Sequence, residues 1–101
     1  MALVGESLSG ATAVGPGMSI TFDLPKAKHG LTISVTGSPS VAQVSLDGTI
    51  NGTDWFSIAT ATLTNMIAFP VSPVAVTATR ANLVSLSGGT SPTVTAWIAA
   101  A

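Results

Sequence analysis

In "LTISVTG", residues 31–37, apolar and hydroxyl side chains alternate up to a glycine. Successive side chains of an extended chain point to opposite faces, so one face of this stretch is apolar and the other carries only hydroxyl groups. β-branched residues such as Ile33 and Val35 suit a pleated, half-buried surface. The stretch therefore predicts a strand with Leu31, Ile33 and Val35 turned inward.

Four further runs repeat this alternation: "MSITFDL" (18–24), "VAQVSLDG" (41–48), "VAVTATR" (74–80) and "PTVTAWIAA" (92–100). The residues predicted to point inward are Met18, Ile20, Phe22 and Leu24; Ala42, Val44 and Leu46; Val74, Val76 and Ala78; and Val94, Ala96 and Ile98. Trp97 is predicted on the opposite face of the last run. The Thr-rich stretch "ATATLTNMIA" (59–68) is predicted to be strand and turn, because it ends at Phe69-Pro70.

Turn-forming residues separate these runs. "GPG" (15–17), "GSPS" (37–40), "PVSP" (70–73) and "SGGTSP" (87–92) each end one run and begin another. Short strands at roughly ten-residue spacing favour an antiparallel all-β architecture. We predict a single antiparallel β-sandwich, of jelly-roll or immunoglobulin-like type, with about seven to nine short strands.

The length of 101 residues predicts one domain. The first 17 residues alternate poorly and are rich in glycine. They are predicted to be either an N-terminal arm or an irregular edge strand, and residues 18–101 to be the sandwich domain. A frayed terminus is the simpler alternative to an arm.

Charged residues make up only 7% of the chain, against a usual fraction of about 25%. Three basic and four acidic residues offer no basic footprint for a phosphate backbone, so we expect no nucleic-acid partner. The sequence contains neither a long apolar span nor a signal-peptide pattern, so we expect no membrane partner. A surface made mainly of Ser, Thr, Ala and Gly suits a protein that packs into an assembly.

The sequence gives little support to catalysis or to a cofactor. The single histidine, His29 in "PKAKHG", is predicted to be an exposed loop residue. A general base needs a positioned partner, and a zinc site needs more nitrogen or sulfur ligands than one His and no Cys supply. We therefore expect no enzyme activity, no metal and no cofactor.

Polar residues gather in "VSLDGTINGTDWFSIAT", residues 44–60. Three interpretations are open: a weak Ca²⁺ site at Asp47, Asn51 and Asp54, a glycan site that uses Trp55 with Asp54 and Asn51, or turn chemistry. In the turn interpretation Asp47-Gly48 and Asn51-Gly52 are both reverse-turn pairs, and Asp54 accepts backbone N–H groups. Trp55 and its neighbour Phe56 should point to opposite faces, with one in the core and the other at a surface or interface.

Four short motifs in this half of the chain are Ser45–Gly48 ("SLDG"), Asp54-Trp55, Arg80 with Asn82, and Gly88–Thr90 ("GGT"). In their order and spacing they resemble small β-sandwich proteins of tailed-phage virions. The resemblance covers the chain from Val44 onward, about 60 residues. A similar layout occurs in discoidin-like and carbohydrate-binding sandwiches, so the motifs indicate the fold better than the role.

The resemblance implies a non-enzymatic structural virion protein that is assembled in the host cytoplasm. Its role would be that of a capsid decoration protein, which cements the shell and has the major capsid protein and copies of itself as partners. Two alternatives stay open: a carbohydrate-binding module with Trp55, Asp54 and Asn51 at its site, and a tail or connector accessory protein.

Overall fold

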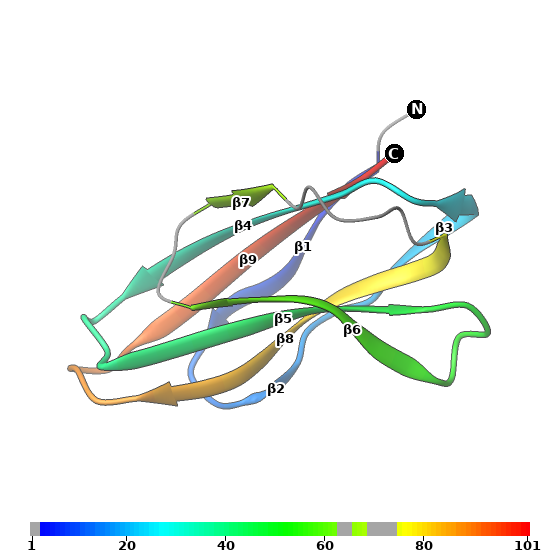
Figure 1. Cartoon of the computed structure of the whole chain (residues 1–101). Coiled ribbons are helices and arrows are strands. Elements are labelled where there is room, and N and C mark those ends of the chain that lie inside the picture. Colours follow the sequence, from blue (N-terminus) through cyan, green and yellow to red (C-terminus); the bar gives the residue numbers. More distant parts are fainter. Residues whose placement is uncertain (1–2, 63–65, 69–74) are drawn as a thin grey trace.

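The structure of the chain is a computed structural model that describes residues 3–62, 66–68 and 75–101 (Figure 1). The described part contains nine strands: β1 (Leu3–Ala11), β2 (Gly15–Pro16), β3 (Ile20–Lys26), β4 (His29–Thr36), β5 (Val41–Thr49), β6 (Trp55–Thr62), β7 (Met66–Ala68), β8 (Val76–Ser87) and β9 (Thr93–Ala100). Within these residues, no helix is long and apolar enough to cross a membrane.

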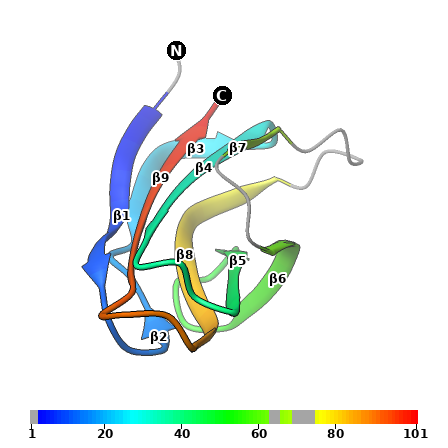
Figure 2. The ribbon, with the colours of Figure 1, turned by 90° about the vertical axis from the view of Figure 1, so that its left-hand side faces the viewer.

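The strands form two sheets that face each other. One has the order β1-β9-β4-β7, and the other has the order β2-β8-β5-β6, with β3 also paired to β8. Figure 2 shows β1, β9 and β4 on one side of the molecule and β8, β5 and β6 on the other. Every strand pair is antiparallel. The prediction of an antiparallel all-β sandwich is therefore confirmed.

The strand pairs differ in regularity. Strands β4 and β9 pair without interruption from His29 opposite Ala100 to Thr36 opposite Thr93. Strand β5 lies between β8 and β6, and its register shifts once against each neighbour. The shift against β6 lies between Leu46 and Asp47 and leaves one extra residue on β6. Such a bulge changes the direction in which the following side chains point.

Two corners carry the chain from one sheet to the other, and they are bonded together. The N–H of Thr90, between β8 and β9, donates to the carbonyl of Gly37, between β4 and β5, at 2.9 Å. The N–H of Ser40 donates to the carbonyl of Ser87 at 2.9 Å. Gly89 has a φ of +70°, and a Cβ there would lie 2.2 Å from the Gly37 oxygen. Only glycine satisfies both conditions.

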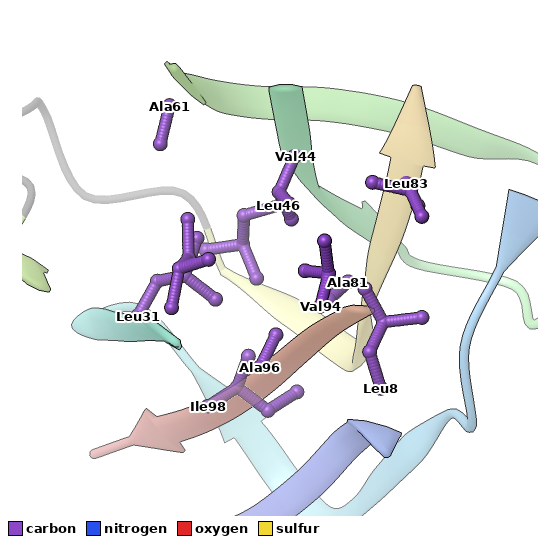
Figure 3. Close-up of a cluster of buried hydrophobic side chains, with 11 residues drawn as sticks. Leu8, Leu31, Val44, Leu46, Ala61, Ala81, Leu83, Val94, Ala96 and Ile98 are labelled. Atoms are coloured by element: carbon purple, nitrogen blue, oxygen red, sulfur yellow. The ribbon is translucent and has the colours of Figure 1, made fainter. Parts of the chain in front are cut away.

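The core fills the space between the sheets (Figure 3). Its buried side chains come from both sheets: Leu8, Leu31, Ile33, Val44, Leu46, Ala61, Ala81, Leu83, Val94, Ala96 and Ile98. Leu46 on the central strand β5 is 0% exposed, and its cross-strand neighbours are Ala59 and Ala81. A large side chain thus sits between two small ones, which is the pattern that lets facing layers interdigitate.

Most of the predicted inward residues are buried, which confirms the alternation in three of the runs. Those in the runs at 31–37, 41–48 and 92–100 are buried or half-buried. Val76 and Ala78 are buried too, but so is Thr79, so the alternation predicted for 74–80 is not seen in the burial of β8. Trp97 is 46% exposed on the opposite face, as predicted. Val74 and residues 63–65 of the predicted strand-and-turn segment lie outside the described residues.

The alternation fails at the two ends of "MSITFDL". Met18 and Leu24, both predicted to be inward, are each 70% exposed. Met18 precedes β3, and its backbone N–H is bonded to the carbonyl of Ser7 rather than to a strand partner. Strand β3 pairs with β8 at Ile20, Thr21 and Lys26, with a register shift in between, so the sheet does not hold Leu24 to the inward side.

The N-terminal residues from Leu3 to Ala11 form β1, which pairs with β9 through two register shifts. Ser7 ties this strand to the opposite sheet. Its hydroxyl donates to the Met18 carbonyl at 2.6 Å and accepts the backbone N–H of Ala81 at 2.8 Å.

Candidate functional site

The loop between β5 and β6 is organised by one amide side chain. The Oδ1 of Asn51 accepts the backbone N–H of Thr53 at 2.9 Å and that of Asp54 at 2.8 Å. The Nδ2 of Asn51 donates to the Oδ2 of Asp54 at 2.7 Å. Gly52, with a φ of +85°, makes the left-handed turn. The acceptor of these backbone N–H groups is therefore Asn51, whereas the prediction gave this role in the loop to Asp54.

The Asp47-Gly48 pair is not a turn, contrary to the prediction. Both residues lie inside β5, opposite Ser57 and Phe56 of β6. Gly48 is required there by packing, because a Cβ would lie 2.8 Å from the Cδ1 of Ile58 and 3.0 Å from the Cγ1 of Val76. A glycine is needed at this position, but the reason is the close packing of Ile58 and Val76 against it and not a turn.

Asp47 lies in a small polar cluster on the outer face of the five-stranded sheet. The Ser45 hydroxyl donates to the Oδ1 of Asp47 at 2.6 Å, and the Ser45 and Ser57 hydroxyl oxygens are 2.9 Å apart. A hydroxyl has one proton, so Ser57 is the donor to Ser45 when Ser45 donates to Asp47. Asp47 and Ser45 are buried although they face away from the core.

Arg80 and Trp55 lie beside this cluster. Arg80 is directly opposite Asp47 on β8, with its Nε 3.8 Å from the Oδ2 of Asp47. The guanidinium carbon of Arg80 lies 4.1 Å from the centroid of the Trp55 ring, a cation–π contact. In the β5–β6 pairing, Trp55 lies opposite Thr49 and Ser57 lies opposite Asp47. Arg80 on β8 therefore contacts both the aromatic ring and the carboxylate on this sheet surface.

The expectation that Trp55 or Phe56 enters the core is wrong. Trp55 is half-buried in its stack with Arg80, and Phe56 is 39% exposed. The bulge residue Ile58 packs against the core instead. The extra residue breaks the alternation between Trp55 and the inward-facing Ala61, and simple counting from the sequence does not reveal it.

The site residues named from the sequence are brought together only in part. Asn51 and Asp54 bond to each other in the turn, whereas Trp55 stacks on Arg80 and Asp47 is bound by Ser45. Ser45 and Ser57 were not identified from the sequence as site residues. Ser45 and Ser57 can be assigned to this cluster only from the strand register, which places both on the same sheet face as Asp47.

Ser45, Asp47 and Ser57 form a hydrogen-bonded polar cluster. Ser45 and Asp47 could form part of a nucleophilic triad only with a base between them. The single histidine is on β4, in the other sheet, where it begins the strand opposite Ala100. It is half-buried, so the prediction of an exposed loop histidine is wrong. Within the described residues, no three His, Cys, Asp or Glu side chains are grouped as a metal site requires.

No protein-family model and no curated protein matches the sequence. Among solved structures, the fold is similar to that of the SPBc2 prophage-derived protein YomS, with a TM-score of 0.66. The similarity covers 99% of this chain and 92% of that protein at 13% sequence identity. The two proteins therefore share one fold along almost their entire lengths.

Proposed function

We propose that this protein is a non-enzymatic structural component of a tailed-phage virion, and that within the virion it is a decoration protein that cements the capsid. The proposal rests mainly on the fold shared with a prophage-derived protein over almost the whole of both chains. The sequence motifs from Ser45 to Thr90 support the same assignment independently, because they resemble those of tailed-phage sandwich proteins.

The candidate site is consistent with a role in contact rather than in reaction. Its carboxylate and amide groups are engaged with one another, through Ser45 and Asp47 on the sheet and through Asn51 and Asp54 in the turn. The aromatic ring of Trp55 is stacked on Arg80. These contacts use the groups that the glycan alternative at Trp55 would need for a ligand, so the geometry favours a stabilising role for them.

Exposed apolar side chains at one end of the sandwich form the proposed shell contact. Ile50 is 65% exposed, and Leu24 and Phe56 are exposed as well. Leu24 lies on β3 and Ile50 follows β5, and both strands pair with Thr79 near the start of β8. Phe56 on β6 lies opposite Gly48 near the end of β5. Apolar groups grouped at one end of a weakly charged domain are suited to burial against a neighbouring subunit.

In the proposed mechanism, this apolar end packs across boundaries between subunits of the major capsid protein, and copies of the protein bind at symmetry-related positions. The free energy would come from apolar burial, because seven charged residues supply little electrostatic attraction. Binding should therefore depend only weakly on salt concentration.

The proposal is tested by co-sedimentation of the purified protein with expanded shells of the phage that encodes it. We expect saturable binding at micromolar concentration. The Ile50→Ser, Phe56→Ser double variant should lose binding at least tenfold. Val14→Ser, which changes an equally exposed side chain elsewhere, is the matched control. If the protein pellets with tails instead, or forms tubes by itself under negative-stain microscopy, the tail or connector role is correct and the decoration role is wrong.

A further inference from the structure

The outer face of the four-stranded sheet carries a hollow beside an exposed tryptophan. The hollow has a volume of about 330 Å³ and is lined by Thr32, Ile33, Ser34, Val35, Thr95 and Trp97. Thr32 lies opposite Trp97, and Ser34 lies opposite Thr95, in the regular β4–β9 pairing. These four residues alternate with inward ones, so they form a square on the outer face with the indole at one corner.

The chemistry of the lining is one aromatic face and three hydroxyl groups without a charge. Trp97 is 46% exposed, so its ring is accessible from solvent. The Oγ1 of Thr95 accepts the backbone N–H of Gly10 at 3.0 Å, which fixes that hydroxyl and leaves its proton available to a ligand. The next outward-facing pair along β4 and β9, Thr36 opposite Thr93, also carries two hydroxyl groups, which are hydrogen-bonded to each other. Hydroxyl groups thus continue along the sheet away from the tryptophan.

We infer that this hollow binds a neutral glycan. A sugar ring has an apolar C–H face, which suits the negative face of an indole, and hydroxyl edges that both donate and accept hydrogen bonds. The hollow volume is at the lower end of the range of about 300–1,000 Å³ for small-molecule sites, as fits one or two sugar units. The lining carries no charge, and the charged residue paired with Trp97 on β1 is Glu6, whose carboxylate would repel an anion. Both observations favour an uncharged ligand.

A protein partner fits this hollow less well. The centres of protein interfaces are depleted in serine, and hot spots are poor in serine and threonine. Here three of the four outward-facing lining residues are Thr32, Ser34 and Thr95. The inference does not depend on the virion role, because the apolar end proposed to contact the shell is formed by β3 and the β5–β6 loop, in the opposite sheet.

The two tryptophans of the chain make a direct test available. The Trp55→Phe variant leaves Trp97 as the sole tryptophan, so its fluorescence reports on the hollow alone. We expect chitotriose, cellotriose or maltotriose to change this fluorescence saturably, with a Kd on the order of 1 mM or tighter. Trigalacturonate, a charged trisaccharide, should bind at least tenfold more weakly than the best neutral one.

Variants distinguish the hollow from the rest of the surface. Trp97→Ala should abolish glycan binding measured by calorimetry, and Ser34→Ala should weaken it several-fold. Thr60→Val, which removes an exposed hydroxyl from the other sheet, should leave it unchanged. A urea unfolding curve for each variant shows whether the fold is intact, and Ser34→Ala still tests the inference if Trp97→Ala is unstable. Absence of saturable binding to all three neutral glycans overturns the inference, as does unchanged binding by Trp97→Ala. If the wild-type protein binds no glycan and the Trp97→Ala variant loses shell binding, this face is a protein contact instead.

Discussion

Replacing Arg80 by methionine removes the guanidinium that lies between the Trp55 ring and the Asp47 carboxylate while keeping much of the apolar stem. Two losses follow. The cation–π contact at 4.1 Å from the ring centroid is worth about 0.5–1 kcal/mol at a partly exposed site. Asp47 then keeps its Ser45 hydroxyl donor but loses its nearby positive charge while nearly buried, which costs about 1–2 kcal/mol.

Together these losses predict a decrease of about 2 kcal/mol in the free energy of unfolding, out of about 5–15 kcal/mol for a domain of this size. Arg80→Lys keeps a positive charge near Asp47 but loses the planar stack, so it should cost about half as much. Lys28→Met is the control for the loss of one positive charge and should change stability by less than about 0.5 kcal/mol.

Urea unfolding followed by far-ultraviolet circular dichroism measures these values without relying on Trp55 as the reporter. A double-mutant cycle of Arg80→Met with Asp47→Asn should give a coupling energy of about 1 kcal/mol. If Arg80→Met is within about 0.5 kcal/mol of the wild-type protein, or if the two changes are additive, Arg80 does not stabilise the fold through Trp55 and Asp47. Trp55 would then be an accessible surface ring, and its role as a ligand contact would have to be reopened.

Three further changes test the fold and the loop by the same unfolding assay. Leu46→Ala should lower the free energy of unfolding by about 3–5 kcal/mol, because the small cross-strand neighbours of this fully buried residue cannot fill the cavity. Leu24→Ala, at an exposed site, should lower it by less than about 0.5 kcal/mol, and similar costs for both would contradict the assigned core. Asn51→Ala should cost about 1–2 kcal/mol, because the turn loses its backbone acceptor; an unchanged midpoint would show that the turn forms without it. Gly89→Ala should destabilise more than Gly52→Ala, since both have positive φ but only the former meets backbone atoms; equal effects would rule out the close approach at the corner.

The fold class could be predicted because its evidence is local. The alternation from Leu31 to Val35 and from Val94 to Ile98 corresponds to the most regular strand pair of the structure, β4 with β9. In that pair no bulge interrupts the period of two, so the inward residues counted from the sequence are those that are buried.

The alternation was misleading where pairing is irregular. Leu24 follows the pattern but lies in a stretch of β3 between two separated contacts with β8. The burial of Ile58 depends on a bulge opposite Leu46 and Asp47, which has no signature in a single sequence. Local periodicity assumes continuous pairing and therefore fails at both places.

The candidate site depended on contacts between distant residues. Asn51 and Asp54 are three residues apart, so their position in one polar loop could be predicted from the sequence. The stack of Arg80 on Trp55 joins residues 25 positions apart on strands separated by β5. Which side chain covers Trp55 could be known only after the strand order and register were known.

Thermal disassembly of expanded shells, measured with and without bound protein, is the most direct test of the proposed cementing role. Light scattering on shells saturated with the protein should show disassembly at a higher temperature than on bare shells, because a ligand that binds only the assembled state stabilises it. The Ile50→Ser, Phe56→Ser double variant should leave the temperature of bare shells unchanged. If the parent protein at saturating micromolar concentration neither binds the shells nor raises their disassembly temperature, the cementing role is contradicted.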